Sequence, residues 1–279
     1  MMDFIQFATA HGLEITHLET GKIARCKTSD HRSKRNGAYY YEHSFGWCQN
    51  WAVHEHPVIW ITDKEVDQKE LQLKLKKSRE KYNHERARLN RAAIKKAETM
   101  LKLCRNDTSS YLASKGFSEM CFNMLLEEDK EPLLCVPMRI NGNLSGLQVI
   151  APDGKKKFLY GTNASLATFD IGLGANVFLV EGLATGLSMQ KIAAYLKIPY
   201  TIRVCFSAGN MAKVTKLHDK PILICDNDES GTGERVGKES GKRYYMPPVA
   251  GDDINDECNR SGYFTVAQKI KKIIYQKLI

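Results

Sequence analysis

The sequence lacks any apolar run long enough to span a bilayer, so we expect no membrane partner. Its first residues carry neither the basic segment nor the long apolar core of a signal peptide, which predicts a cytoplasmic protein. No two of its 8 cysteines form a Cys-x-x-Cys pair, so the strongest signature of a zinc site is missing. Several cysteines lie inside apolar runs, as Cys135 and Cys225 do, and this pattern is typical of reduced thiols in a core.

Positive charge is what the sequence has in excess. The formal net charge is +9 over 279 residues, and this length suggests two or three domains. A basic balance favours a polyanionic partner, and nucleic acid is the leading candidate. A solvated basic surface without a partner is the alternative at this point.

Residues 1–62 predict a small antiparallel β domain, with short strand-like pieces divided by polar turns. Basic and aromatic side chains alternate in it, a mixture that suits single-stranded nucleic acid, although the aromatics could equally form the core of the sheet. The candidate binding residues are Arg25, Arg32, Lys34, Arg35, Trp47 and Trp51. We do not expect bound zinc, because the spacing of the available ligands fits no standard zinc motif: Cys26, His31, Cys48, His54 and His56.

The next two segments predict a helical linker and a basic α+β subdomain. Residues 63–105 have a helix-forming composition without Gly or Pro from 64 onward. Residues 106–172 contain three strands joined by tight turns, at 133–140, 144–150 and 156–160. We expect Arg139 and the run Lys155, Lys156 and Lys157 to lie on neighbouring strands, where some of them would face phosphate.

Residues 173–260 alternate between strands and helices, and a closing amphipathic helix follows in 261–279. The strands are expected at 177–180, 201–206 and 221–225, with a short last strand at Tyr244 and Tyr245. This order predicts an α/β domain with a parallel sheet covered by helices on both faces.

Carboxylates follow the strands of this predicted sheet. Glu181 comes after the first strand and Asp226 and Asp228 after the third, while Asp252, Asp253 and Asp256 follow the last. Reactive groups collect beyond the carboxyl ends of parallel strands, and Asp226 and Asp228 would project from the same side of an extended segment. Together these oxygens suit Mg²⁺ or Mn²⁺. One acidic pair after a strand can also be a turn or a helix cap, as Ser230-Gly231 suggests for Asp228.

These motifs resemble the TOPRIM domain, which bacterial-type primases, topoisomerases and some nucleases share. The resemblance covers roughly 105–260 and is closest to primase-like TOPRIM proteins of phages and plasmids. It is carried by Glu181-Gly182, Ser207-Ala208-Gly209-Asn210, Asp226-Asn227-Asp228 and Gly251-Asp252-Asp253-Ile254-Asn255-Asp256. Residues 1–62 look like a primase zinc-binding domain that lacks the paired ligands.

The resemblance implies a DNA primase that makes short RNA primers on a single-stranded DNA template from nucleoside triphosphates, in phage or plasmid replication in a bacterial host cell. It implies metal ions held by Asp226, Asp228 and Asp252 or Asp253, with Glu181 as a general base or further ligand. Arg139 and Lys155 to Lys157 would hold triphosphate or template, and Asn210 would orient a nucleotide. A phosphate-binding Gly-x-x-x-x-Gly-Lys-Ser/Thr loop is absent, so we expect any replicative helicase to be a separate partner.

Two other functions fit the same residues. A TOPRIM nuclease would use the same carboxylates with Mg²⁺ to cut a phosphodiester. A non-catalytic single-stranded DNA-binding protein that assists replication is the second, and the intact set of Glu181, Asp226 and Asp228 argues against it. A topoisomerase is not favoured, because the chain is short and offers no clear tyrosine for transesterification.

Overall fold

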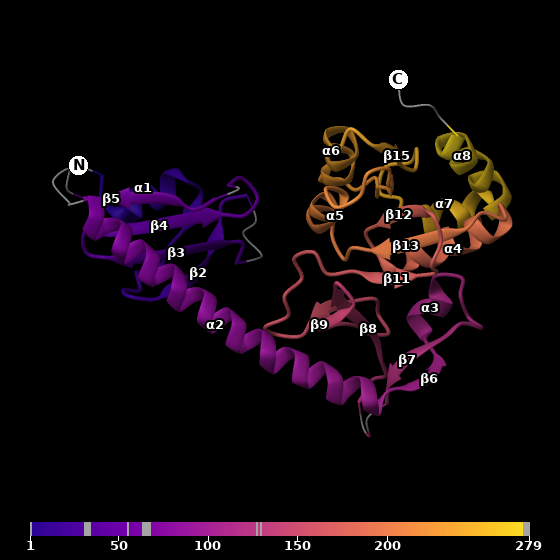
Figure 1. Cartoon of the computed structure of the whole chain (residues 1–279), viewed down its shortest axis with the longest axis horizontal. Helices are drawn as coiled ribbons and strands as arrows, with labels where there is room; N and C mark the ends of the chain where they lie inside the picture. Colours follow the sequence, from indigo (N-terminus) through magenta and orange to yellow (C-terminus); the bar gives the residue numbers. More distant parts are fainter. Residues whose placement is uncertain are drawn as a thin grey trace. The chain divides into compact units, whose positions relative to one another are not determined.

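The computed structural model describes residues 2–30, 35–54, 56–62, 68–126, 128 and 130–275. The chain forms two compact units, Met1–Glu85 and Arg86–Ile279, and the boundary between them falls inside the long helix α2 (Gln68–Leu103; Figure 1). Among the described residues, no helix is both long enough and apolar enough to cross a membrane.

The first unit is a five-stranded antiparallel sheet with its strands in chain order. Its elements are α1 (Phe4–Ala10), β1 (Leu13–Glu14), β2 (Ile23–Thr28), β3 (Gly37–Glu42), β4 (Phe45–Asn50) and β5 (Val58–Ile61). The ring of Phe4 on α1 packs against Tyr39, Tyr41 and Trp60, with ring centroids 5.0 to 5.9 Å apart. This aromatic cluster is the core of the unit, so part of the aromatic content of residues 1–62 serves folding.

The second unit contains two sheets. The first is antiparallel, in the order β10-β9-β8-β7-β6, and is formed by β6 (Arg105–Thr108), β7 (Cys121–Leu125), β8 (Leu133–Ile140), β9 (Asn143–Ile150) and β10 (Lys156–Phe158). Helix α3 (Ser110–Ser114) lies between β6 and β7 in the chain. The last part of α2 packs on this sheet through Ala97, against Cys135 and Leu147. Asn90 of α2 also donates hydrogen bonds to the carbonyls of Ser145 and Gly161.

The second sheet has the order β11-β13-β12-β14-β15. Its strands are β11 (Phe169–Ile171), β12 (Asn176–Val180), β13 (Tyr200–Val204), β14 (Ile222–Ile224) and β15 (Arg243–Tyr245). The last four strands are parallel to one another, whereas β11 pairs with β13 in the antiparallel sense. The expectation of a parallel sheet was therefore wrong at one edge, where the alternation Phe169-Asp170-Ile171 of β11 is only three residues long and too short to indicate a strand by itself.

Helices cover both faces of this sheet. They are α4 (Leu183–Tyr195), α5 (Ala208–Thr215), α6 (Thr232–Glu239), α7 (Ile254–Ser261) and α8 (Tyr263–Tyr275). Alternate residues of β12 face opposite sides: Phe178 and Val180 join the core under α4, α7 and α8, and Leu179 joins the core under α5 and α6. This alternation explains why β12 reads as one continuous apolar run.

The strand order creates a switch point between β12 and β14. The chain leaves β12 through α4 to β13 on one side and then returns through α5 to β14 on the other side of β12. Ligands of open α/β sheets bind at such a point, beyond the carboxyl ends of the two strands. Glu181 directly follows β12 and Asp226 follows β14, so the fold places both carboxylates at this position.

Gly233 lets α6 pack closely against the chain after β14. A Cβ atom at this glycine would lie 2.2 Å from the carbonyl oxygen of Asp226, a backbone atom that cannot move away alone. We expect Gly233→Ala to lower the free energy of unfolding by about 1–3 kcal/mol, because the added methyl group forces the helix off the strand. Urea denaturation of the whole chain measures this change.

Gly209 offers a matched control, since it is also helical, lies in α5 and has no atom within 4 Å of an added Cβ. Gly209→Ala is expected to leave stability unchanged or to raise it by up to about 1 kcal/mol. Equal losses of stability in the two variants would contradict this account of the α6 contact.

Candidate active site

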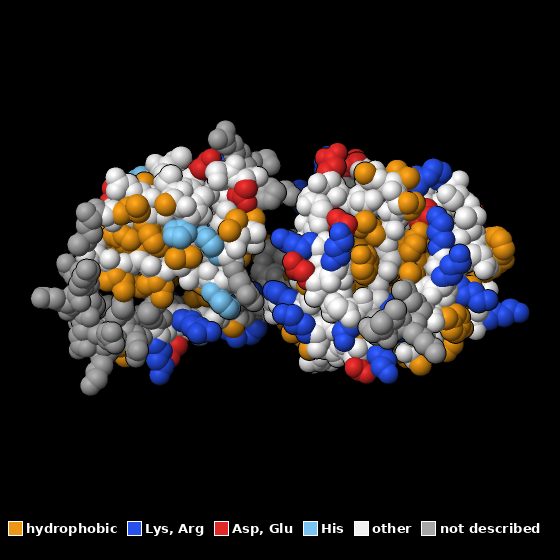
Figure 2. Space-filling view, turned by 90° about the horizontal axis from the view of Figure 1, so that it is seen from above, with side chains coloured by type: hydrophobic (Ala, Val, Ile, Leu, Met, Phe, Trp, Pro, Cys, Tyr) orange, Lys and Arg blue, Asp and Glu red, His pale blue; other side chains and the backbone are white. Residues whose placement is uncertain are grey.

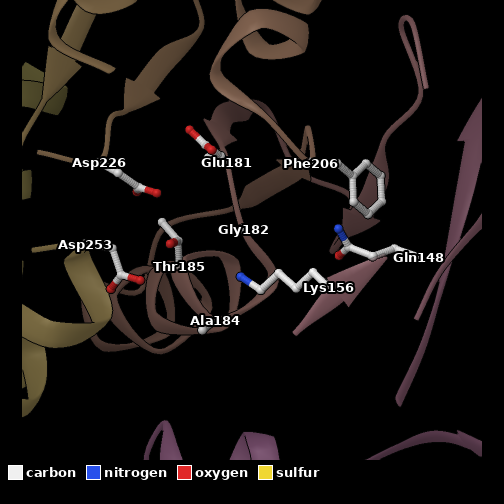
Figure 3. Close-up of a pocket in the computed structure, with 9 residues that line it drawn as sticks. All are labelled: Gln148, Lys156, Glu181, Gly182, Ala184, Thr185, Phe206, Asp226 and Asp253. Atoms are coloured by element: carbon white, nitrogen blue, oxygen red, sulfur yellow. The ribbon is translucent and has the colours of Figure 1, made fainter. Parts of the chain in front are cut away.

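Three carboxylates and one ammonium group border a cavity of about 100 Å³ at the switch point (Figure 3). The carboxylates belong to Glu181, Asp226 and Asp253, and the ammonium belongs to Lys156 of β10. The cavity thus joins the parallel sheet to the antiparallel sheet that precedes it in the chain. Its remaining wall includes Gln148, Thr185 and Phe206.

Backbone hydrogen bonds of Asn227 bring the third acidic segment to this edge of the sheet. The Asn227 amide donates to the carbonyl of Asp252 at 2.9 Å, and the Gly251 amide donates to the carbonyl of Asn227 at 2.6 Å. Asp253 then caps α7, accepting hydrogen bonds from the backbone amides of Asn255 and Asp256. Its side chain is therefore held at the cavity by the helix that it starts.

Asp226 is in an environment that disfavours its charge. Burial, followed by the charges of Glu181 and Asp253, raises the pKa of the Asp226 carboxyl to about 8, and Lys156 opposes this shift. Its Oδ1 atom is buried and has no hydrogen-bond partner. A buried acceptor without a partner is costly, so this oxygen marks a place where a positive or hydrogen-donating group would be favourable.

Glu181 has the same kind of environment. Burial and then the charge of Asp228 raise the pKa of the Glu181 carboxyl, while Lys156 and the backbone amide of Ala208 lower it. The raised pKa makes Glu181 a better proton acceptor than an exposed carboxylate at neutral pH.

Lysines balance part of this negative charge. The Nζ atom of Lys156 lies close to Gly182 at the start of α4: a Cβ atom built on this glycine would be 3.7 Å from it. The same Nζ atom lies 5.7 Å from the centroid of the Tyr111 ring. Lys115 pairs with Asp256 at 3.2 Å and lies 3.9 Å from Asp253. Lys115 thus compensates the negative charge of Asp253 and Asp256 from outside the cavity lining, whereas Lys156 lines the cavity.

Asp252 and Asp228 lie outside the cavity lining. Asp252 forms an ion pair with Arg260, and Asp228 is exposed and accepts a hydrogen bond from Ser230 at 2.8 Å. Strand β14 ends at Ile224, and a turn follows only at Glu229 and Ser230, so Asp226 and Asp228 both lie beyond the strand. The charge of Asp228 still helps to raise the pKa of Glu181 and of Asp226, although Asp228 does not line the cavity.

The expected row of cations is also interrupted. Strand β9 lies between β8 and β10, so Arg139 is not on a strand next to the lysines. The register pairs Lys156 with Ile150 and Arg139 with Leu144. These positions are about 20 Å apart along the sheet, at a rise of about 3.3 Å per residue.

The remaining cations of the second unit have different surroundings. The guanidinium of Arg139 donates to the Gly142 carbonyl, and Lys155 pairs with Asp153 at 2.6 Å on the surface. Lys157 is exposed. Figure 2 shows Lys and Arg side chains scattered over one face of this unit and not gathered into one patch.

Asn210 does not face the cavity as the nucleotide-orienting role requires. Its side chain accepts from the amide of Leu166 and donates to the carbonyls of Ala167 and Cys205, at 2.7 to 2.8 Å. Both amide hydrogens are used inside the protein, and Asn210 is buried. Its structural role is to tie the start of α5 to residues 166–167.

In the first unit, Arg25 and Trp51 form a pair. The Arg25 guanidinium lies 4.1 Å from the centroid of the half-exposed Trp51 ring and donates a hydrogen bond to the Arg35 carbonyl. Trp47 on β4 is partly buried. Arg32 and Lys34 lie outside the described residues.

Among the described residues, the cysteine and histidine side chains form no metal-binding cluster. Six of the eight cysteines are buried, and all eight, which lie in the described part of the chain, are free thiols. Burial raises the pKa of Cys26 to about 11 and that of Cys48 to about 12. In the part of the chain that the structure describes, no group of three or more His, Cys, Asp or Glu side chains is arranged to hold a metal ion. Glu181, Asp226 and Asp253 therefore line the cavity, but their carboxylates are not close enough together to form a preformed three-ligand metal site.

Sequence reasoning missed several residues of the cavity. Gln148 lies on β9, Thr185 on α4 and Phe206 between β13 and α5, and none of the three was singled out as a site residue because each fits an ordinary core position in its own segment. Lys115 directly follows the short helix α3, and no pattern around it indicates a contact with Asp253 or Asp256. Their proximity follows from the packing of the two sheets.

No family model matches the chain. It is similar in fold to the primase fragment of the bacteriophage T7 primase-helicase protein, with 17% sequence identity and a TM-score of 0.43; the match covers 61% of this chain and 75% of that chain. A second similar structure contains primase domains bound to an RNA/DNA hybrid and dTTP, together with the lagging-strand DNA polymerase of bacteriophage T7. Here the identity is 17%, the TM-score 0.43 and the coverage 62% and 92%.

The strained environment of Asp226 predicts that its charge destabilises the metal-free protein. Unfolded Asp loses its proton near pH 3.8, whereas folded Asp226 keeps it up to about pH 8. The folded state binds more protons between these values, so stability should fall as the pH rises through this window. Asp226→Asn should therefore melt at a higher temperature than the wild type in EDTA, and the gain should be larger at pH 8 than at pH 5.

Asp219→Asn is the control, because it makes the same change of charge at an exposed position of the same unit. Its melting temperature should stay close to that of the wild type at both pH values. A lower melting temperature for Asp226→Asn in EDTA would contradict the assignment of an unpaired, disfavoured carboxylate.

Proposed function

We propose that this chain is a TOPRIM-type DNA primase that joins ribonucleotides into short primers on single-stranded DNA. The observation that carries the proposal is the meeting of Glu181, Asp226 and Asp253 with Lys156 around one cavity at the carboxyl ends of β12 and β14. Phosphoryl transfer needs carboxylates for metal ions and a cation for phosphate at one place, and this cavity brings both together.

Divalent metal fits the residues at the cavity. The buried Oδ1 atom of Asp226 has no partner, and burial followed by the charges of neighbouring carboxylates raises the pKa of the Asp226 carboxyl, so a cation there would offset both penalties. Asp226 and Asp253 are the ligands that we propose, with Glu181 and Asp228 close enough to affect one another's charge. When bound, Mg²⁺ or Mn²⁺ would supply charge neutralisation at the phosphate and acidify the attacking hydroxyl.

The protein's own groups have separate tasks in this proposal. Glu181 accepts the proton of the attacking 3′-hydroxyl, for which its raised pKa is suited. Lys156 binds an oxygen of the α-phosphate and balances charge that develops there. The first turn of α4 begins next to this lysine at Gly182, which has no side-chain cap, so its backbone amides can also face phosphate.

Other basic residues would guide the nucleic acid. In the first unit, the Arg25–Trp51 pair offers a cation and a ring at one exposed position, which suits a single-stranded template. Further template contacts are proposed, from the sequence alone, for Arg32, Lys34, Arg35 and Trp47. Arg139, Lys155 and Lys157 would contact template or triphosphate elsewhere on the second unit. A separate replicative helicase would be a further partner in phage or plasmid replication.

Primer synthesis tests the proposal directly. The purified chain is incubated with single-stranded DNA, labelled ribonucleoside triphosphates and Mg²⁺ or Mn²⁺. We expect short RNA products from the wild type and a loss of at least about 100-fold in Asp226→Asn, because the buried carboxylate is removed from the cavity. The Asp219→Asn protein should retain wild-type synthesis.

The products also separate the other two functions. Shortened DNA without new RNA would show a nuclease and refute the primase. DNA binding without either product would show a non-catalytic binding protein and refute it as well.

Asp252 and Asp253 are expected to differ although they are neighbours in sequence. Asp253→Asn keeps an oxygen that can cap α7 but removes charge from the cavity, so primer synthesis should fall at least about tenfold with little change in stability. Asp252→Asn removes only the partner of Arg260 and should retain activity within about threefold.

Binding of Mg²⁺ gives a second readout for this pair. Its addition should raise the melting temperature of the wild type and of Asp252→Asn, and should do so less for Asp253→Asn. The reverse order of the two variants in both assays would show that Asp252 serves the site in place of Asp253.

A further inference from the structure

Gln148 is a largely buried residue whose side chain lines the proposed active site. It lies on β9, is only 5% exposed and lines the cavity, yet its amide has no hydrogen bond among the described residues. Figure 3 shows the amide end of Gln148 directed toward the cavity, beside the ring of Phe206. The amide is not among the buried side-chain atoms that lack a partner, so it contacts the solvent of the cavity, where a ligand can replace water.

The cavity is chemically divided. Asp226, Asp253 and Glu181 lie toward one side in Figure 3, Gln148 and Phe206 toward the other, and Lys156 reaches between them. A nucleoside triphosphate has the same sequence of chemistry, from the charged phosphates to the neutral sugar. The carboxylate and lysine side suits metal and phosphate, and the amide and aromatic side suits an uncharged hydroxylated group.

Phe206 is held in a conformation that shapes this neutral side. Its φ angle of +67° is unusual for a bulky residue, and such strain is kept only where surrounding contacts enforce it. Asn210 holds the preceding residue by a hydrogen bond to the Cys205 carbonyl, and the ring of Phe158 meets Phe206 edge-on at 6.1 Å. Phe206 is therefore a fixed wall next to the Gln148 amide.

The position of Gln148 near Lys156 limits what it can contact. Both side chains line the same cavity, and in a nucleotide the group that follows the phosphate is the sugar, so a nucleotide whose phosphate binds Lys156 brings its sugar toward Gln148. A phosphate oxygen is better served by Lys156, which carries the positive charge. A sugar hydroxyl can both donate and accept a hydrogen bond, and the amide of Gln148 can meet it in either direction.

We infer that Gln148 binds the 2′-hydroxyl of the nucleotide whose phosphates face Lys156, and that it thereby selects ribonucleotides over deoxyribonucleotides. This inference rests on the proposed primase function. A nucleotide in the cavity displaces water from this amide, so a sugar that lacks the hydroxyl leaves the amide without a partner and binds less well. Gln148 is thus a specificity-determining residue on the antiparallel sheet, separate from the carboxylates of the parallel sheet.

Gln148→Met tests this role, since Met conserves most of the volume but cannot make the hydrogen bond. Primer extension is measured with each ribonucleotide and its 2′-deoxy counterpart. We expect the wild type to favour ribonucleotides, and Gln148→Met to lower the ribonucleotide-to-deoxyribonucleotide ratio of incorporation efficiencies by about 10- to 100-fold. The lost efficiency should be that of ribonucleotide incorporation, and the melting temperature should stay close to that of the wild type because Met keeps most of the volume and no hydrogen bond within the described residues is removed.

Ser145→Ala is the matched control on the same strand. Ser145 is also buried, but its hydroxyl donates a 2.6 Å hydrogen bond to the Asn163 carbonyl. This variant should lose stability and keep the wild-type sugar preference. An unchanged ratio in Gln148→Met, or an equal loss with both sugars, would overturn the inference.

Calorimetric binding of ATP and dATP in the presence of Mg²⁺ separates failure of this inference from failure of the proposed function. Tighter binding of ATP that disappears in Gln148→Met supports the contact even if no primer is made, in which case only the primase activity is refuted. Primer synthesis by the wild type with equal binding of ATP and dATP refutes the role of Gln148 alone.

Discussion

Parallel pairing of β12 with β14 is the constraint on which the site depends. The register sets Val180 beside Ile224, so both strands end at one edge and their next polar residues, Glu181 and Asp226, emerge there together. The charged form of each carboxylate is disfavoured at that position, since burial and the negative charges of neighbouring carboxylates raise both pKa values. The apolar cores on both faces of the sheet supply the stability that keeps these strands paired.

The rest of the site compensates for this concentration of negative charge. Lys156 approaches from the antiparallel sheet, and Lys115 pairs with the carboxylates at the start of α7. The short bridge from Asn227 to Gly251 and Asp252 then fixes Asp253 next to Asp226. Because Oδ1 of Asp226 still has no partner, the compensation is incomplete in the protein alone. Such incomplete pairing is typical of functional sites, where stability and activity compete.

Local patterns were reliable where a long apolar or helical run stood between clear turns. The strands at 133–140, 144–150 and 177–180 and the helix before 105 correspond to β8, β9, β12 and α2. The strands β6, β7 and β11 and the helix α7 were not predicted, because they are short or polar and depend on their neighbours for pairing. Helix α7 was hidden in an acidic segment whose first residues are a capping box, Asp253 with Asp256.

The same distinction holds for individual site residues. Glu181 and Asp226 were identifiable because acidic residues follow several apolar strands in turn, a repetition that a single turn or helix cap does not explain. The different surroundings of Asp252 and Asp253 were not, since adjacent side chains of one residue type diverge only when a helix cap and an ion pair with Arg260 are formed. The separation of Arg139 from Lys156 likewise follows from strand order and register, which no local pattern encodes.

The amino-acid sequence by itself determined that an α/β sheet would carry acidic residues at its strand ends, because hydrophobic periodicity and turn chemistry act over a few neighbouring residues. Only the tertiary structure decided which of those residues share a cavity, and that Lys156, Gln148 and Phe206 join them from other elements. The physical reason is that burial, charge coupling and unpaired hydrogen-bonding groups depend on contacts between distant segments, and these exist only after the sheets have packed.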